Sequence, residues 1–365
     1  MIETIKPLYN EHSSLTLLVD GNWLLMSRIA VLRNKYFDTE SLVHELQLLM
    51  IRSINAILRS FPEIDNIIFI MDGGSWRGKV KIPDFLVQQG VSYKGNREKS
   101  EGIDWNQVFN AYEALALCIG QWSEVSVCSE HNIEGDDWCW WWSNILNNDN
   151  TNVIIWSADK DLTQLVKYNE NNGVFTGTLY SRGSKTVLTL PETVKTDTEN
   201  SLTSFFNPNY VYNYNILNSI IKKSSEINYI KPSDVVIDKI FRGDAADNIL
   251  PVITKETKTG RKMKLTDKQL DKTLNIWDDN SLYNFIDNIL ESKLYKDKVT
   301  DTKDNIKEHV IYNRKLVALD EHVYDKSIID TMIDHNYYNK SNDLSVVEQR
   351  IKGETDDMSD LLNSI

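Results

Sequence analysis

The sequence has few of the features that mark secreted or membrane proteins. Three cysteines in 365 residues are an odd number without paired metal spacing, which argues against a disulfide framework and favours buried thiols in a reducing compartment. No apolar run is long enough to span a bilayer, and the charged N-terminus does not resemble a signal peptide. We therefore expect a soluble, cytoplasmic protein without a membrane partner.

The chain is also poor in positive charge. A net charge of −13 by itself speaks against nucleic-acid binding. The basic residues are concentrated, however, in two islands. Such islands favour contact with a phosphate backbone, although a solvated charged face would have the same composition. The first island contains Arg77, Lys79, Lys81, Lys94, Arg97 and Lys99, and the second contains Lys255, Lys258, Arg261, Lys262, Lys264 and Lys268.

The apolar pattern predicts an α/β fold with a mostly parallel central sheet flanked by helices, followed by a smaller C-terminal helical domain. Strand-like runs alternate with helical patterns from residue 15 to about 190, and a hairpin is predicted within residues 174–190. Helical patterns dominate from residue 216 onward. The predicted parts are an α/β domain at 1–195, a connection or insertion at 196–225, the helical domain at 226–345 and a tail at 346–365.

Carboxylates follow several of the predicted buried strands. Asp20 closes the run from Leu15, Asp72 closes the run from Ile67, and Asp159 follows the run that ends at Trp156. Because ligands of open parallel sheets bind outside the carboxyl ends of the strands, we expect these acids to converge in one crevice. A single aspartate at a strand end is more often a helix cap. Several acids together repel one another, and a hard divalent cation is their natural neutraliser.

Two metal ions about 4 Å apart can generate a nucleophilic water and stabilise the leaving oxygen in phosphodiester hydrolysis. We predict such a binuclear centre. The spacing of Asp244 and Asp247 is expected to place both on one face of a helix. The predicted ligands are Asp20, Asp72, Glu134, Asp136, Asp137 and Asp159 nearest the first ion, and Asp161, Asp244 and Asp247 at the second.

Six short segments with acidic or basic residues follow one another along the chain: Val19–Asn22, Met71–Gly74, Tyr93–Arg97, Glu134–Asp137, Ser157–Asp161 and Gly243–Ile249. They occur in the order found in the flap endonuclease and 5′ to 3′ exonuclease superfamily, and the chain most resembles the T-even bacteriophage type of ribonuclease H. The resemblance implies a nuclease that removes RNA primers and 5′ flaps during lagging-strand synthesis, in the host cytoplasm if its source is a virus. It implies two Mg²⁺ ions, replaceable by Mn²⁺, and substrates of duplex or branched DNA and RNA–DNA hybrid.

By this resemblance, Lys94 and Arg97 match the basic pair of a helical arch, which we place at about residues 76–112. Arginine holds a phosphate in a planar fork, and lysine supplies a compact charge near the scissile phosphate. Tyr93 is expected to stack on the terminal base or to serve as a packing aromatic. Arg77 and Lys79 resemble the arch entrance.

The chain departs from many relatives after Ile249, because no Gly-x-Gly follows. We therefore expect no bound K⁺, and we expect the duplex to be held by Lys255, Lys258, Arg261, Lys262 and Lys264. Residues 358–365 resemble a peptide that docks onto a sliding clamp, with a frayed terminus as the alternative. A single-stranded DNA-binding protein is a further expected partner of a monomeric chain.

Two rival functions share part of this pattern. A branched-DNA-binding replisome adaptor without turnover would keep the fold, but none of the nine acids is missing. A PIN-like ribonuclease acting on single-stranded RNA would share the sheet and the acids. It would lack the arch segment and the Gly-Asp-x-x-Asp segment, and both are present.

Overall fold

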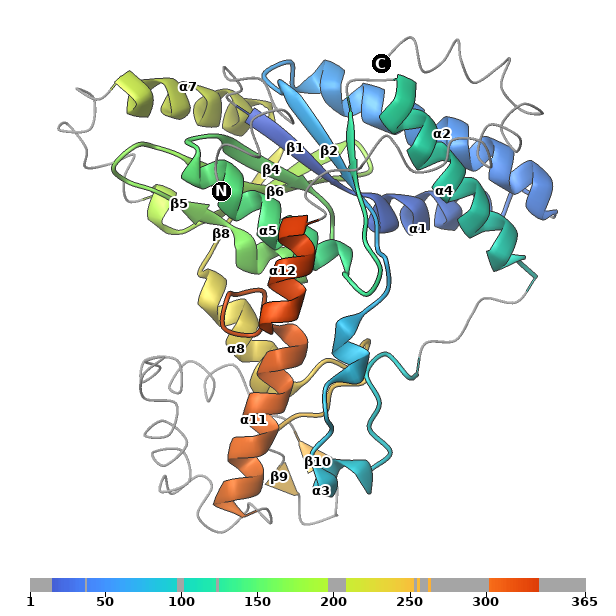
Figure 1. Cartoon of the computed structure of the whole chain (residues 1–365). Coiled ribbons are helices and arrows are strands. Elements are labelled where there is room, and N and C mark those ends of the chain that lie inside the picture. The colour runs from blue at the N-terminus through green and yellow to red at the C-terminus, as the bar shows by residue number, and fades with distance from the viewer. Residues whose placement is uncertain are drawn as a thin grey trace. The chain divides into compact units, whose positions relative to one another are not determined.

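The computed structural model describes residues 15–36, 38–96, 102–122, 125–195, 208–252, 255–256, 262–263 and 302–334. The chain forms two compact units (Figure 1). The first unit comprises Met1–Gly74, Ser100–Ile230 and Lys326–Ile365, and the second comprises Ser75–Lys99 and Lys231–Asp325. Among the described residues, no helix combines the length and the apolar character that crossing a membrane requires.

The first unit is built on a sheet with the strand order β3-β2-β1-β4-β6-β7-β8, and β5 pairs with β6. Five of the strand pairs are parallel, and β5–β6 and β6–β7 are antiparallel. The predicted mostly parallel sheet is confirmed. The strands are β1 (Leu15–Asp20), β2 (Asn66–Ile70), β3 (Ser126–Cys128), β4 (Asn152–Trp156), β5 (Lys167–Tyr168), β6 (Phe175–Arg182), β7 (Lys185–Pro191) and β8 (Glu226–Ile230).

The burial of a strand explains whether it could be predicted from the sequence. Every residue of β1 and β4 is buried, as expected for central strands covered on both faces. The antiparallel pair β6–β7 forms the predicted hairpin and turns at Gly183, whose φ is +62°. In contrast, β8 is partly exposed throughout and carries no clear apolar alternation. Its residues lie in the predicted helical domain, whereas the structure pairs them with β7 in the sheet.

Helices cover both faces of this sheet. One face of β1, carrying Leu15, Leu17 and Val19, shares a core with helices α1, α2, α4 and α7. Helix α5 packs on β1, β2 and β4 and buries Trp138 and Trp142 completely or nearly so, which agrees with a packing role for its tryptophans. The helices are α1 (Gly21–Leu32), α2 (Thr39–Ser60), α4 (Trp105–Trp122), α5 (Gly135–Asn148), α7 (Pro208–Lys223) and α12 (Lys326–Asp334), with the 3₁₀ helix η4 (Asp161–Leu165).

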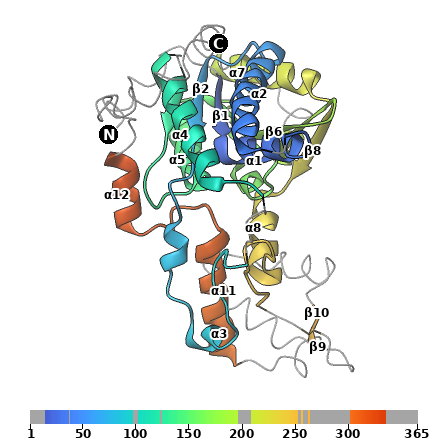
Figure 2. The ribbon, with the colours of Figure 1, turned by 90° about the vertical axis from the view of Figure 1, so that its right-hand side faces the viewer.

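The second unit has a smaller core around two helices. Helix α8 begins with proline at its first position and ends at Gly243, and it lies beside α11 in both Figure 1 and Figure 2. Ile240 and Phe241 of α8 and Val310 of α11 are fully buried there. The elements are η3 (Trp76–Lys79), α3 (Asp84–Val87), α8 (Pro232–Arg242), β9 (Lys255–Glu256), β10 (Lys262–Met263) and α11 (Lys303–Val317).

The observed division differs from the predicted boundaries at several points. Helix α7 from the predicted connection, and β8 and α12 from the predicted helical domain, belong to the first unit. Residues 75–99, which we expected in the arch of the α/β domain, belong to the second unit. Leu86 and Val91 from this segment are buried in the core of α8 and α11. The remainder of the expected arch region contains the start of α4, which belongs to the first unit. The predicted tail at 346–365 lies outside the described residues.

Candidate metal centre

Three strand ends bring acids to the same edge of the sheet. Strand β1 ends at Asp20 and lies between β2 and β4. Its pairing is parallel and places Asp20 opposite Ile70 and Val19 opposite Trp156. Asp72 and Asp159 follow those two residues closely in sequence, so they leave the sheet at the edge where Asp20 ends β1.

Asp20 is nearly buried, with 8% of its surface exposed. Its Oδ1 accepts the N–H of Trp23 at 2.9 Å, which caps α1, and its Oδ2 accepts the hydroxyl of Ser157 at 2.7 Å. Burial raises the pKa of Asp20 to about 7, the two hydrogen bonds oppose this rise, and the charges of Asp72 and Asp159 add to it. Ser157 also links two acids, because its Oγ accepts the N–H of Asp159 at 3.0 Å.

The start of α5 adds two further acids to this group. Burial raises the pKa of Asp136 well above its ordinary value, and Asp159, Asp20, Glu134 and Asp72 raise it further. These five carboxylates therefore act on one another electrostatically. The N-terminus of a helix favours such negative charge, and Asp136 lies in the first turn of α5.

Asp137 differs from its neighbours in the same motif. Its side chain is completely buried, and its Oδ2 accepts the N–H of Glu134 at 3.1 Å. This contact satisfies one of the backbone donors that every helix start leaves open. The structure shows that Asp137 caps α5, and its role as a metal ligand stays a prediction.

Asp72 is exposed, yet both of its carboxylate oxygens accept hydrogen bonds. Asn22 donates to Oδ2 at 2.6 Å, and the N–H of Gly135 donates to Oδ1. A Cβ on Gly135 would lie 2.8 Å from that oxygen, so the glycine permits the close approach of the helix start. Asn22 itself accepts the hydroxyl of the buried Tyr112 at 3.0 Å. Sequence reasoning assigned no role to Tyr112, because nothing in the pattern of α4 distinguishes it from a core aromatic.

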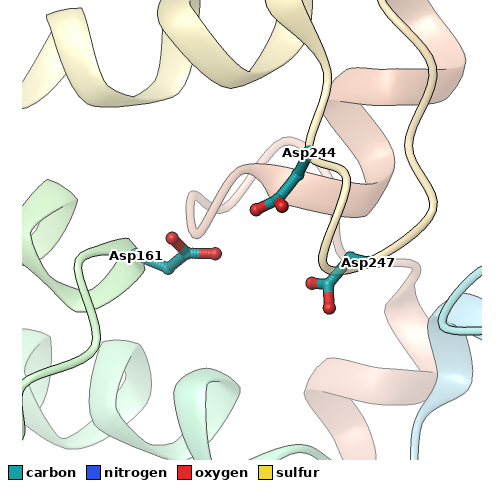
Figure 3. Close-up of side chains that lie close together, drawn as sticks. All are labelled: Asp161, Asp244 and Asp247. Carbon is teal, nitrogen blue, oxygen red and sulfur yellow. The ribbon is translucent and has the colours of Figure 1, made fainter. Parts of the chain in front are cut away.

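Asp244 and Asp247 belong to the second unit and lie on a turn after α8 (Figure 3). The prediction of a shared helix face is wrong: α8 ends at Gly243, whose φ is +67°, and Asp244 forms a β-bridge with Ile249. Lys239 Nζ lies 2.5 Å from Asp244 Oδ2. Burial alone would raise the pKa of Asp244, but the hydrogen bond and charge of Lys239 lower it below its ordinary value.

Asp161 is the third acid labelled in Figure 3 and belongs to the first unit. It opens η4, and its N–H donates to Asp159 Oδ1 at 2.9 Å. The backbone thus fixes the orientation of the Asp159 carboxylate from within the same Ser157–Asp161 motif.

Three hydrogen bonds within the second unit join residues 92–96 to residues 244–248, and we call this pair of segments the linked loops. The N–H of Lys94 donates to the carbonyl of Asp247 at 2.9 Å. Asn96 donates to the carbonyl of Ala245, and Asn248 donates to the carbonyl of Ser92, both at 2.8 Å. The two sequence motifs that contain the predicted Lys94 and Asp247 are therefore held together.

The side chain of Lys94 lies over the ring of Tyr93, with Nζ 4.9 Å from the ring centroid. Lys94 has a φ of +55°, an uncommon conformation for a residue with a side chain. Tyr93 also packs against the core of the second unit. The structure therefore supports the packing alternative for the Tyr93 ring. Lys94 lies against this ring, and its contact with substrate phosphate stays a prediction.

The other predicted substrate contacts fare differently. Arg77 is 2% exposed, with its Cζ 4.7 Å from the ring centroid of Trp76, and its role as a phosphate contact stays a prediction. Lys79 is exposed. Lys255 and Lys262 lie on the antiparallel pair β9–β10, a two-stranded ribbon that forms without the Gly-x-Gly segment. Arg97, Lys258, Arg261 and Lys264 lie outside the described residues.

The acids of the first unit fit a hard divalent cation. They present oxygen donors, and their own repulsion together with burial opposes ionisation of Asp20 and Asp136. The nearby thiol of Cys139 is buried, and burial together with Asp20, Asp136 and Asp72 raises its pKa well above the ordinary value. The carboxylate oxygens of the acids are the kind of donor that suits a hard divalent cation.

Comparison with known proteins gives a likeness of fold. No protein-family model and no curated protein sequence matches the chain. Among solved structures, the flap endonuclease of bacteriophage T5 in a pseudo-enzyme-product complex with DNA and metal ions is 15% identical with a TM-score of 0.52; the match covers 88% of this chain and 97% of that one. The T5 5′-exonuclease with bound zinc matches at 15% identity over the same shares, with a TM-score of 0.51. The predicted fold is thus confirmed, and the chain has the fold of the bacteriophage T5 flap endonuclease.

Proposed function

We propose that the chain is a divalent-metal-dependent 5′ nuclease that hydrolyses phosphodiesters in branched and duplex nucleic acid. The observation that carries this proposal is the placement of Asp20, Asp72 and Asp159 at one edge of the sheet, where Asp72 also meets the start of α5, which carries Glu134 and Asp136. Such crowding is unfavourable unless a cation binds there. The shared fold with a T5 enzyme solved with DNA and metal ions supports the same activity.

These five acids and Asp137 would hold the first Mg²⁺, some of them through water, and Asp161, Asp244 and Asp247 remain the proposed ligands of a second. When bound, such ions supply a nucleophilic water near neutral pH and stabilise the developing charge of the leaving oxygen. The chain's own contribution is orientation. Ser157 and the N–H of Trp23 fix the two oxygens of Asp20. Asn22 and Gly135 do the same for Asp72.

Basic residues would bind the substrate backbone. Lys94 and Arg97 are proposed to contact the phosphates near the scissile bond, and Lys79 with the lysines of 255–264 would hold the duplex. We further propose ribonuclease H activity and a role in removing RNA primers and 5′ flaps during replication. A sliding clamp and a single-stranded DNA-binding protein are the proposed protein partners.

The test compares the wild type with Asp159→Ala, because Asp159 is exposed and its removal leaves the core intact. Three 5′-labelled substrates are incubated with Mg²⁺ side by side: a flap, a nicked RNA–DNA hybrid and free single-stranded RNA. We expect short products from the flap and the hybrid, and a loss of at least about 100-fold in the variant with flap binding retained. Asp149→Ala, at the other end of α5, is the matched control and should cleave normally.

Each rival predicts a different result. Full activity of Asp159→Ala would remove the metal assignment. Cleavage of single-stranded RNA alone would indicate a PIN-like ribonuclease. Tight flap binding by the wild type without any product would indicate an adaptor.

A further inference from the structure

A buried tyrosine stands behind Asp72 and is connected to it through one side chain. Tyr112, on α4, is 4% exposed and donates its hydroxyl to Asn22 Oδ1 at 3.0 Å. Asn22 then donates from Nδ2 to Asp72 Oδ2 at 2.6 Å. Its Oδ1 also receives the N–H of Asp72 at 3.4 Å. A continuous line of hydrogen bonds therefore runs from the core of the first unit to an exposed acid of the proposed metal centre.

The direction of this line follows from Asp72. A side-chain amide can present either end to a neighbour, but an ionised carboxylate only accepts, so Asn22 turns its NH₂ group toward Asp72 and its Oδ1 inward. That inward oxygen accepts the hydroxyl of Tyr112 and the N–H of Asp72. The hydroxyl of Tyr112 therefore holds Asn22 in the orientation that donates to Asp72.

A glycine gives a second, independent sign of this arrangement. A Cβ on Gly21 would lie 2.3 Å from the hydroxyl oxygen of Tyr112 and 2.6 Å from the carbonyl oxygen of Ile70. No real Cβ approaches other atoms so closely, so residue 21 must lack a side chain for the hydroxyl to reach Asn22. The glycine in the Val19–Asn22 motif thus leaves the space through which Tyr112 acts.

We propose that Tyr112 is a positioning residue that acts through Asn22 to hold Asp72 in the orientation that binds a divalent cation. The inference rests on the proposed function, because it assigns Asp72 to the metal centre. Groups that orient metal ligands typically contribute about 10- to 100-fold to metal affinity. Tyr112 acts at one remove, so its removal should produce an effect at the lower end of that range.

The test is a double-mutant cycle read by Mn²⁺ binding to the full chain, measured by calorimetry without substrate. Tyr112→Phe should weaken binding about 10-fold, and Asn22→Ala should weaken it at least as much. The double variant should bind like Asn22→Ala alone, because the tyrosine has no route to Asp72 once the amide is gone. Tyr210→Phe is the matched control, since it removes another buried hydroxyl of the same unit, one bonded to Tyr168 at 3.3 Å.

The outcomes separate this inference from the nuclease proposal. If the wild type binds Mn²⁺ and Tyr112→Phe binds it equally well, the inference is overturned and the nuclease proposal is not. Additive losses in the double variant have the same meaning. A comparable loss in Tyr210→Phe would mean that any buried cavity has this effect and would also overturn it. A wild type that binds no Mn²⁺ overturns both. Circular dichroism and thermal melting of each variant establish that the fold is retained.

Discussion

Aspartates of the two units meet opposite surroundings. In the first unit, Asp20 is set among two neutral donors and two other carboxylates, and its pKa rises to about 7. In the second unit, Asp244 forms an ion pair with Lys239, and its pKa falls below the ordinary value. The chemical group is the same in both places. The difference shows that neighbouring groups set the ionisation of an aspartate: burial and other carboxylates oppose the ionisation of Asp20, and Lys239 favours the ionisation of Asp244.

The largest expected effect comes from removing the charge of Asp20. Asp20→Asn removes a ligand charge, so cleavage should fall by at least about 100-fold. The variant keeps the side-chain volume and loses repulsion from the other acids, so thermal stability without divalent ions should stay equal or rise. The corresponding change in the second unit, Asp244→Asn, should lower stability because Lys239 loses its partner. Cleavage rates and melting temperatures of both variants measure the contrast. A marked loss of stability in Asp20→Asn would show that its carboxylate is structural.

Divalent ions should stabilise the first unit. At a concentration 100 times the dissociation constant, Mg²⁺ or Mn²⁺ should add about 2.7 kcal/mol to the free energy of unfolding at pH 8. This gain should shrink as the pH falls through about 7, because Asp20 then takes up a proton that competes with the cation. Melting curves with and without Mg²⁺ at several pH values measure it. A gain that does not depend on pH would argue against Asp20 as a ligand.

Without divalent ions, the units should respond to acid in opposite directions. The folded pKa of Asp20 lies above its ordinary 3.8, so its native carboxyl holds a proton that the unfolded chain releases, and lowering the pH from 7 to 4 stabilises the first unit. Burial lowers the pKa of His309, in the second unit, from 6.5 to about 4. In this pH range His309 is protonated in the unfolded chain but stays neutral in the native one. The free energy of unfolding of the second unit therefore decreases as the pH falls from 6.5 to 4.

We expect the His309 contribution to reach about 3 kcal/mol. Hydrogen exchange followed by mass spectrometry resolves the two units, and exchange rates corrected for pH give the opening free energy of each. His309→Gln removes the titrating group and should flatten the acid dependence of the second unit alone. Parallel changes in both units would contradict the assignment.

The smallest expected effect comes from removing the basic partner of Asp244, which makes its surroundings more like those of Asp20. Lys239→Met removes the partner of Asp244, whose side chain is 18% exposed, and should cost about 1 kcal/mol of stability. The variant should then recover more stability from Mg²⁺ than the wild type does, because Asp244 now carries uncompensated charge. Thermal melting with and without Mg²⁺ checks this, and an unchanged response to Mg²⁺ would show that Lys239 does not set the difference.

The sequence predicted the sheet and the strand-end acids because both depend on local signals. Fully buried runs such as β1 and β4 are unmistakable, and the acids that follow them share an edge by the geometry of parallel strands. The capping contact of Asp137 could not be predicted, because a helix cap and a metal ligand use the same residue type in the same first turn.

Long-range packing was less accessible. Nothing local indicates that Leu86 and Val91 join the core of α8 and α11, since their segment has no apolar period. Tyr112 is separated from Asn22 by 90 positions, and its helix reads as an ordinary amphipathic one. The turn at Asp244 was mistaken for helix because its three-residue spacing suits both, and the positive φ of Gly243 decides between them.

The linked loops have a practical consequence for protein engineering. Residues 92–96 and 244–248 are distant in the sequence, yet three hydrogen bonds make them one mechanical part. A chimera that transplants the basic loop from a relative without its matching turn will carry donors that face the wrong acceptors. The smallest exchangeable module of this region is therefore a pair of peptides, and mutant libraries that randomise one of them should randomise the other at the same time.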